Sequence, residues 1–344
     1  MTDDTNQTRG GTPSEDPGYR GSSDPVIDVH VHGIPQGLVD LVRRRGVSDV
    51  SIVDGGSRRF SFPDMAPSPP PPTGLFNFEA MDRDARDSGM TSRLVGPWTD
   101  LVGYSLPFDQ AKVWSGAYNE ALVESCAEYT TLEALATVPL QFPDLAASVL
   151  SHAREIGCKG VMIGSDVPGS SLGAPELNTF WEAAAAMGMP VVLHPTFMSS
   201  PRILLQRGLK NAVARAGATA VAVADLVYAG VMERHPDVVL VIAHGGGSFL
   251  HLLDRILRNQ DLGWADSDVD IEASVARLYW DSVVLSSSAV AGLVATVGAD
   301  RVVLGSDYPF PWEPDPVGTV RAAGLGEAHL SAVLGGTASR LFGI

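Results

Sequence analysis

The sequence predicts an α/β protein whose fold is a (β/α)8 TIM barrel with a small insertion after the first strand. Eight short apolar runs alternate with amphipathic segments between residues 26 and 307. Several of these runs are apolar at consecutive positions, which is typical of parallel strands buried on both faces. Histidine or aspartate stands at the end of four runs, and in such a barrel the loops that gather there carry the functional residues.

The eight predicted strands follow one another at short intervals. They are expected at residues 26–31, 92–97, 132–138, 160–163, 190–194, 238–244, around Tyr279 and at 301–307. Helices between strands imply crossover connections and therefore a parallel sheet. Eight such units favour a closed barrel over an open doubly wound sheet. In addition, no G-x-G-x-x-G fingerprint of a dinucleotide-binding fold follows the first run.

The helices are predicted from apolar residues at helical spacing. The segments are 109–129, 144–156, 176–187, 220–235, 249–258 and 289–297. The apolar stripe of the third segment consists of Leu177, Phe180, Trp181, Ala184 and Met187. Gly188 follows this stripe, where a helix is expected to end.

The chain is expected to form one barrel domain over residues 25–344. Residues 1–24 are rich in polar residues, glycine and proline, so we expect a disordered tail there. The insertion covers about residues 33–75, and we expect it to be irregular. Four consecutive prolines at positions 69–72 favour an extended loop.

Composition excludes several classes of protein. The net charge of −16 argues against a nucleic-acid partner or an anionic membrane surface, and 45% hydrophobic residues suffice for a large core. Cys126 and Cys158 are too few for a disulfide framework or a cysteine zinc site, so we expect a reducing, cytoplasmic location. The sequence shows no secretory signal pattern and no apolar run near the ~20 residues of a membrane span.

The polar residues at the strand ends are those of a metal site. His30 and His32 are two positions apart on a strand, so both side chains point to one face. His194 and Asp307 end two other runs, and imidazole with carboxylate is a donor set that Zn2+ accepts. His244 ends a further run and is left for proton transfer. Any one of these residues alone fits a packed core, but burying all five without such a role would be costly.

Other motifs receive structural interpretations. Residues 169–173 match G-x-S-x-G and 244–247 match H-G-G-G, but Ser171 lacks the strand and helix of a nucleophile elbow, so we reject a serine esterase. The triple glycine is interpreted as a loop that lets the backbone approach a ligand closely. Three further histidines are assigned to helices or polar segments: His152, His235 and His329. His251, on the helix after His244, is the one remaining candidate for lining the site.

With these residues set out, the chain resembles the amidohydrolase superfamily. The most specific stretches are I-D-V-H-V-H, F-W-E-A-A-A-A-M-G-M-P-V-V-L-H-P, A-H-G-G-G-S-F and V-L-G-S-D-Y-P-F-P, in the expected order. The resemblance runs from Val26 to the C-terminus. It is strongest to the branch of 2-amino-3-carboxymuconate 6-semialdehyde decarboxylase and related metal-dependent non-oxidative decarboxylases.

The resemblance implies a set of roles. The ligands of one divalent ion, zinc with manganese as the alternative, would be His30, His32, His194 and Asp307. His244 would be the acid/base that activates water, and Asp307 could also shuttle a proton. Arg255 would reach into the site of a partner subunit to hold a substrate carboxylate, which implies a homodimer. Arg59, or its neighbour Arg58, would complete this clamp.

The expected function is non-oxidative decarboxylation of a small unsaturated or aromatic carboxylic acid. Lys159 lies at the entrance of its strand, which favours one metal ion over a lysine-bridged pair. The P-T-F sequence after His194 and the D-S-V-V-L-S-S-S run differ from the semialdehyde decarboxylase and leave the substrate open. Two alternatives remain: a metal-dependent hydrolase of a lactone, amide or C–C bond, and a non-catalytic metal-binding or scaffold protein.

Overall fold

The computed structural model describes residues 24–53, 58–196, 204, 206–265 and 267–344. Residues 1–23, which make up almost all of the predicted tail, lie outside the described residues. Asp24 is described, and its carboxylate accepts a hydrogen bond of 2.7 Å from the Ser331 hydroxyl. The folded part of the chain is therefore held at its beginning by a contact near its C-terminal end.

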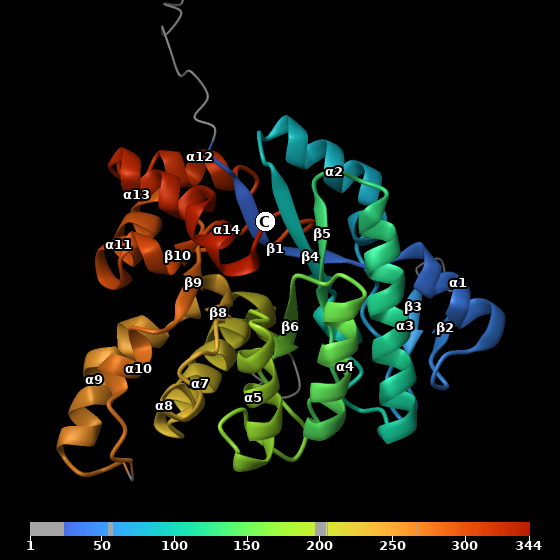
Figure 1. The fold of residues 1–344 in the computed structure, drawn as a ribbon, viewed down its shortest axis with the longest axis horizontal. Coiled ribbons are helices and arrows are strands. Elements are labelled where there is room, and N and C mark those ends of the chain that lie inside the picture. Colours follow the sequence, from blue (N-terminus) through green and yellow to red (C-terminus); the bar gives the residue numbers. More distant parts are fainter. Residues whose placement is uncertain (1–23, 54–57, 197–203, 205, 266) are drawn as a thin grey trace, which may run out of the picture.

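Eight parallel strands form the barrel that the sequence predicts, with helices around it (Figure 1). The strands, each paired with the next, are β1 (Ile27–Gly33), β4 (Ser92–Pro97), β5 (Leu132–Ala136), β6 (Gly160–Gly164), β7 (Val191–His194), β8 (Leu240–Ile242), β9 (Tyr279–Asp281) and β10 (Val302–Val303). All eight coincide with predicted runs. β8 and β10 are shorter than predicted, so His244 and Asp307 follow their strands rather than end them.

The barrel closes through the chain that follows β10. The amide of Val29 donates to the carbonyl of Leu304 at 2.9 Å, and the amide of Asp307 donates to the carbonyl of His30 at 2.9 Å. A third bond runs from the amide of His32 to the carbonyl of Tyr308 at 2.8 Å. The last strand segment therefore reaches β1 and carries Asp307 directly beside the two histidines of that strand.

The helices lie outside the strands and cover them. They are α1 (Gln36–Arg45), α2 (Phe78–Asp87), α3 (Phe108–Ala127), α4 (Pro143–Glu155), α5 (Asn178–Met187), α7 (Arg215–Tyr228), α8 (Val231–Arg234), α9 (Phe249–Asp261), α10 (Ile271–Val275), α11 (Ser287–Val297), α12 (Pro316–Arg321), α13 (Glu327–Ser331) and α14 (Thr337–Phe342). The stripe predicted for α5 is confirmed, since Phe180 and Trp181 are fully buried. Gly188 ends this helix in the left-handed conformation, as expected.

One end of the barrel interior is filled by apolar side chains. Each of the eight strands contributes at least one of them, and α14 adds two: Ile27, Val29, Leu94, Leu135, Met162, Val192, Val241, Tyr279, Val303, Ala338 and Phe342. These residues lie toward the beginnings of the strands. His32, His194, His244 and Asp307 lie at the other end, where the strands lead into the loops.

The segment after β1 is more regular than the sequence suggested. The expectation of an irregular insertion is wrong for residues 36–45, which form α1, because Leu38, Val39 and Val42 bury one face against the core. A short antiparallel hairpin follows, with strands β2 (Ser51–Val53) and β3 (Arg59–Ser61). These elements lie beside α3 on one side of the barrel (Figure 1).

None of the described helices is long and apolar enough to cross a membrane. The two cysteines, Cys126 and Cys158, are both buried and carry free thiols. Burial raises the pKa of the Cys158 thiol to about 12, and the same cause raises that of Cys126. Neither side chain has the exposed, acidic thiol of a reactive cysteine.

Candidate metal centre

An additional residue in β1 places the first two candidate ligands. Asp28 pairs with Arg93 and Val31 pairs with Val95, so three steps along β1 match two steps along β4. Such a bulge shifts the alternation of side chains between the two faces. His30 and His32 both point into the barrel, and their ring centroids lie 5.2 Å apart. The prediction that they share one face is confirmed.

Three histidines are held in the same way, through the Nδ1 atom. His30 Nδ1 lies 2.5 Å from Asp281 Oδ2, His32 Nδ1 lies 2.9 Å from the Pro97 carbonyl, and His194 Nδ1 lies 2.9 Å from the Pro195 carbonyl. Each partner accepts a hydrogen bond, so each Nδ1 carries the proton. The Nε2 atom of each ring is thereby left to face the cluster, where it can bind a metal ion once it carries no proton, which is the usual arrangement of metal-binding histidines.

Asp307 and His244 complete the group from the loops after β10 and β8. Asp307 Oδ1 lies 3.3 Å from His30 Nε2 and 3.2 Å from His32 Nε2, and Asp307 Oδ2 lies 3.5 Å from His244 Nε2. Both residues have left-handed backbone, with φ of 60° for Asp307 and 55° for His244. Such backbone costs roughly 1–3 kcal/mol per residue and is concentrated at functional sites.

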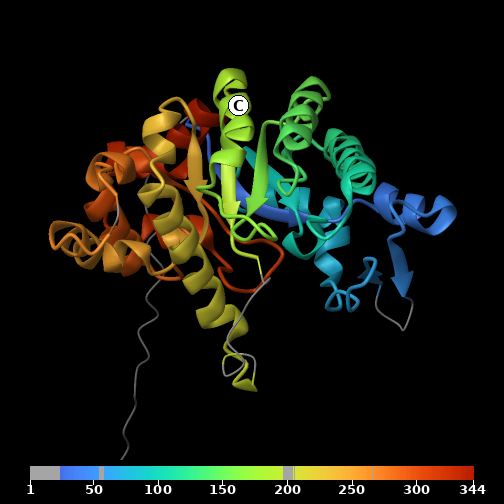
Figure 2. The same cartoon turned by 90° about the horizontal axis from the view of Figure 1, so that it is seen from below.

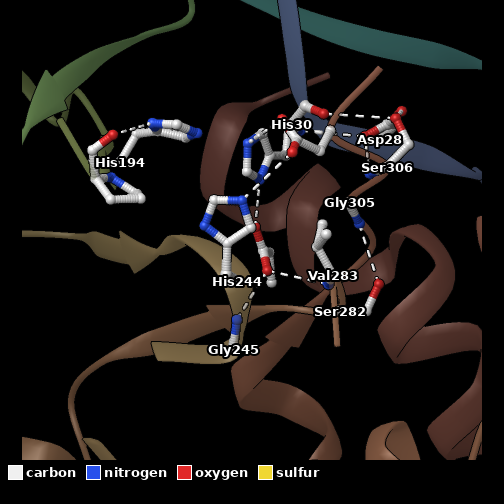
Figure 3. A network of polar contacts seen from close by, with 12 residues as sticks. Asp28, His30, His194, His244, Gly245, Ser282, Val283, Gly305 and Ser306 are labelled. Carbon is white, nitrogen blue, oxygen red and sulfur yellow. Dashed lines mark hydrogen bonds and ion pairs between the residues drawn. The ribbon is translucent and has the colours of Figure 1, made fainter. Parts of the chain in front are cut away.

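The four residues whose ligand atoms all lie within 4.8 Å of one another are His30, His194, His244 and Asp307. Figure 3 shows the three histidines of this group around a common space. His32 adjoins the group, since its Nε2 is 3.2 Å from that of His30. The geometry thus brings together all five residues predicted from the sequence. The closest group of four, however, contains His244 where the prediction has His32.

The site fits a cation because it contains unsatisfied acceptors. His194 Nε2 is buried without a hydrogen-bond partner, and burying such a group costs about 1–3 kcal/mol. Asp307 Oδ1, which faces His30 and His32, is also without a hydrogen bond that meets normal geometry. A divalent ion would satisfy both atoms with donors of the preferred kind, imidazole nitrogen and carboxylate oxygen.

Burial and mutual contacts control protonation in this cluster. Burial by itself lowers the pKa of His30, but the carboxylates of Asp281 and Asp307 beside its two ring nitrogens outweigh it and raise that pKa to about 10. Burial would raise the pKa of Asp307, but its close contacts with His244, His30 and His32 hold it well below its usual range. Burial and the neighbouring His32 lower the pKa of His194. Asp307 is therefore ionised and His194 neutral, as metal binding requires, whereas His30 must release a proton when the ion binds.

The sequence profile of the amidohydrolase family matches residues 27–344, from β1 to the C-terminus. The chain belongs to the amidohydrolase family. The resemblance inferred from the sequence is confirmed, and so is its branch, because the relatives found by sequence include several decarboxylases by name.

One relative of this amidohydrolase is 2-amino-3-carboxymuconate-6-semialdehyde decarboxylase of Dictyostelium discoideum. It is 31% identical over 182 residues, and the match covers 52% of this chain and 51%, about half, of that protein.

Two solved structures of decarboxylases are also similar to this chain. The structure of 5-carboxyvanillate decarboxylase from Sphingomonas paucimobilis has a TM-score of 0.78 at 20% identity, and the match covers 94% of this chain and 100% of that one. Dihydroxybenzoic acid decarboxylase from Polaromonas sp. JS666, solved with manganese and the inhibitor 2-nitroresorcinol, has a TM-score of 0.74 at 19% identity, covering 93% and 97%. These two structures share the fold.

A cavity of about 630 Å³ adjoins the cluster of this amidohydrolase, and His244 and Asp307 form part of its wall. Its volume suits a small organic ligand. Its other lining residues are Asn211, Ala212, Arg215, Ala216, Gly245, Gly247, Leu250, His251, Val283, Val284, Leu285, Ser288, Ala289, Gly292, Leu293, Thr296 and Trp312. His251, the remaining histidine candidate from the sequence, is therefore beside the site.

The triple glycine after His244 serves packing as well as the cavity. A Cβ atom on Gly246 would lie 2.4 Å from the Trp280 ring, and one on Gly247 would lie 2.3 Å from the carbonyl oxygen of Ala216. Both glycines also have positive φ, of 77° and 61°. Gly246 and Gly247 thus allow close approach within the protein, and Gly245 and Gly247 also line the cavity, where a ligand could approach the backbone.

Arg58 and Arg59, which were expected to bind substrate, lie away from the cavity. Arg59 donates to the carbonyls of Ser68 at 2.7 Å and Pro67 at 3.2 Å, and so supports the proline-rich loop. Arg58 donates to Gln36 at 3.2 Å and stacks on the ring of Phe76. Neither arginine lines the cavity.

Arg255 is exposed on α9 and does not line the cavity of its own chain. The apolar residues around it are largely used within the chain, since Leu253 and Ile256 pack partly against the core. Leu252 is 42% exposed. A contact between Arg255 and a substrate would therefore require a second copy of the chain, as the in-trans expectation states.

The remaining sequence interpretations can be compared with the structure directly. Lys159 lies 3.8 Å from Glu133 and is away from the cluster. Ser171 is exposed in a loop, in agreement with the rejection of a serine nucleophile. Phe197, part of the substrate-discriminating P-T-F sequence, lies outside the described residues.

Sequence reasoning missed two charged residues of the site. Asp281 ends β9 as part of a predicted strand, yet its carboxylate also accepts hydrogen bonds from the amides of Gly245 at 3.0 Å and Val283 at 3.1 Å. The signal that could have identified Asp281 from the sequence was its position at the end of a predicted strand. Arg215, the first residue of α7, gave no such signal, because it begins a helix instead of following a strand.

Proposed function

We propose that this amidohydrolase is a metal-dependent non-oxidative decarboxylase, a carbon–carbon lyase acting on a small unsaturated or aromatic carboxylic acid. The observation that carries the proposal is the difference among the clustered histidines. His30, His32 and His194 each have Nδ1 anchored by an acceptor, whereas the buried Nδ1 of His244 has none. Three rings are thus oriented as ligands, and one is left for chemistry at the cavity.

The proposed ligands of a single divalent ion are His30, His32, His194 and Asp307. Zinc is the proposed ion, because three imidazoles and one carboxylate suit it, and manganese is the alternative that the Polaromonas relative contains. The ion would supply Lewis-acid stabilisation of negative charge on the substrate. Lys159, far from this cluster, gives no support for a lysine-bridged second ion.

His244 and Asp307 are the proposed proton-transfer residues. The His244 side chain is 19% exposed, lines the cavity and lies 3.5 Å from Asp307. In the proposed reaction the bond from the ring or chain carbon to the carboxylate breaks, and carbon dioxide leaves. The electron pair stays on that carbon and takes up one proton, which His244 delivers. The carboxylate of Asp307, 3.5 Å from His244 Nε2, can relay to His244 a proton taken up from water, which restores the acid.

The proposal extends to partners and location. A second copy of the chain would place Arg255 at the substrate carboxylate, which makes the enzyme a homodimer. Arg59, which bonds to its own loop, is not assigned to the carboxylate. The free, buried cysteines support a reducing cytoplasmic location. The proposed domain organisation is one catalytic domain over residues 25–344, preceded by a tail at 1–24 and with an insertion at about 33–75.

A hydrolase of a lactone, amide or C–C bond would use the same ligands and the same acid/base. The named relatives favour the lyase, since all three compared above are decarboxylases by name. A non-catalytic scaffold is disfavoured by the full set of ligands beside a cavity. The products separate these functions, because a decarboxylase releases carbon dioxide whereas a hydrolase releases a new acid with its alcohol, amine or carbon fragment.

The test is a substrate screen of the metal-loaded protein with carboxylated phenols and muconate-type acids, and with lactones and amides as candidate hydrolase substrates. Carbon dioxide release should accompany loss of the substrate, and His244→Asn protein should serve as the inactive control. A new carboxylic acid formed from lactones or amides, without carbon dioxide from any acid, would identify the hydrolase instead.

A further inference from the structure

The wall of the cavity contains one permanent positive charge. Among the described lining residues, Arg215 is the one arginine or lysine. It begins α7, and the chain just before it, a helical turn at Lys210–Ala214, contributes Asn211 and Ala212 to the same wall. In Figure 2, the olive helix that contains Arg215 projects from the barrel end toward which the strand arrows point. Arg215 lines the same cavity as His244 and Asp307, so it is at the same end of the barrel as the metal-binding cluster.

The backbone beside Arg215 is fixed against the loop that carries His244. Gly247 packs so closely on Ala216 that a Cβ on this glycine would lie 2.3 Å from the Ala216 carbonyl oxygen. The α7 terminus and the loop after β8 are thus in van der Waals contact. The backbone of Arg215 is thereby held next to the loop that carries His244.

The surroundings of Arg215 suit an anionic ligand. Its guanidinium interacts electrostatically with the carboxylates of Asp307 and Asp100. Arginine has five N–H donors in a planar fork, so it can hold another carboxylate by two parallel hydrogen bonds while it keeps these interactions. Much of the remaining cavity wall is apolar, with Val283, Leu293 and other side chains that can contact an uncharged ring.

We propose that Arg215 is the substrate-binding residue that holds the carboxylate of the substrate from within the same chain. This inference rests on the proposed function. It adds a residue of the same chain, Arg215, to the groups that bind the substrate carboxylate. The ligand class it defines is a small flat anion, with its carboxylate at Arg215 and its ring or unsaturated chain along the apolar wall. Arg255 of a second copy would then add a second positive charge to a site in which Arg215 already holds the substrate carboxylate.

The test compares one ring with and without its carboxylate. Binding of 2,6-dihydroxybenzoate and of resorcinol to metal-loaded protein is measured by calorimetry for wild type, Arg215→Gln, Arg215→Lys and Arg258→Gln. Arg258 is the matched control, because its side chain is 68% exposed on α9 and is paired with Asp261. Metal content and far-UV circular dichroism are measured for each variant.

In Arg215→Gln, affinity for 2,6-dihydroxybenzoate should fall about 10- to 100-fold, since hydrogen bonds to charged groups are lost, while affinity for resorcinol stays the same. Arg215→Lys should recover part of the loss, and Arg258→Gln should bind both ligands as wild type does. The proposal is overturned if wild type does not prefer the carboxylated ring, or if both ligands weaken equally. It is also overturned if Arg215→Gln loses the ion, because Arg215 would then act on Asp307.

The two proposals can fail separately. If wild type prefers the carboxylated ring and loses this preference in Arg215→Gln, but no acid of the screen yields carbon dioxide, the role of Arg215 is supported and the decarboxylase function is not. If carbon dioxide is released and the preference survives in Arg215→Gln, the function is supported and Arg215 is not the carboxylate-binding residue.

Discussion

His30 Nδ1 and Asp281 Oδ2 lie 2.5 Å apart, although 251 positions separate the two residues in the chain. The carboxylate orients the ring of His30 and keeps the proton on Nδ1. The other oxygen of Asp281 accepts from the amide of Gly245, next to His244. One side chain of β9 thus positions both a proposed ligand and the loop of the proposed acid/base.

Asp281→Asn should therefore weaken metal binding without unfolding the barrel. The asparagine oxygen can keep the bonds from the Gly245 and Val283 amides, but its NH2 group would face His30 Nδ1. This donor would force the proton onto Nε2 and block the lone pair that a metal ion needs. We expect the metal dissociation constant to rise about 10- to 100-fold. Chelator competition measures it, with the exposed Asp300→Asn as the control; an unchanged constant would contradict the role of Asp281.

Metal stoichiometry tests the number of ions and the ligand set. Purified protein should contain close to one equivalent of divalent ion per chain by elemental analysis. His194→Ala should lose most of it, because the buried Nε2 of His194 faces the cluster with no protein partner. His152→Ala, on the surface of α4, should keep its metal. Two equivalents per wild-type chain would disprove the mononuclear site.

His244→Asn should separate catalysis from metal binding. Because the Nδ1 of His244 lacks the anchor that the three proposed ligands have, we expect this variant to retain the ion. Loss of a positioned acid/base should lower kcat by about 10²–10⁴-fold. The exposed His329→Asn should keep both metal and activity. If His244→Asn loses metal and activity together, His244 is a ligand, as its place in the closest group of four would allow.

Arg255 offers a test of the homodimer. If Arg255 serves the partner's site, mixing Arg255→Ala with His194→Ala chains gives heterodimers with one intact site each. Random pairing makes about half of the dimers mixed, so activity should return to about a quarter of the wild-type value per chain. The readout is activity after subunit exchange, together with sedimentation to establish the dimer. A monomer in sedimentation, or no recovery after demonstrated exchange, would show that Arg255 does not act in trans.

The barrel and the members of the cluster follow from the order of residues along the chain. Alternating apolar runs and helical stripes require a parallel sheet, and the ends of parallel strands meet at one end of a closed barrel. His30, His32 and His194 are therefore placed together by their positions at strand ends alone. His244 and Asp307 are located almost as well, since each follows its strand by only a few residues.

How these side chains are held, and what adjoins them, depends on contacts between segments that are distant in the chain. The bulge in β1 depends on pairing with β4, and the anchor of His30 comes from a strand near the other end of the chain. Arg215 reaches the cavity because Ala216 packs against Gly247, a contact between a helix and a distant loop. Arg59 looked suitable in sequence but bonds to its own loop. Strand periodicity determines the face to which a side chain points, whereas its partners depend on which segments the folded chain brings into contact.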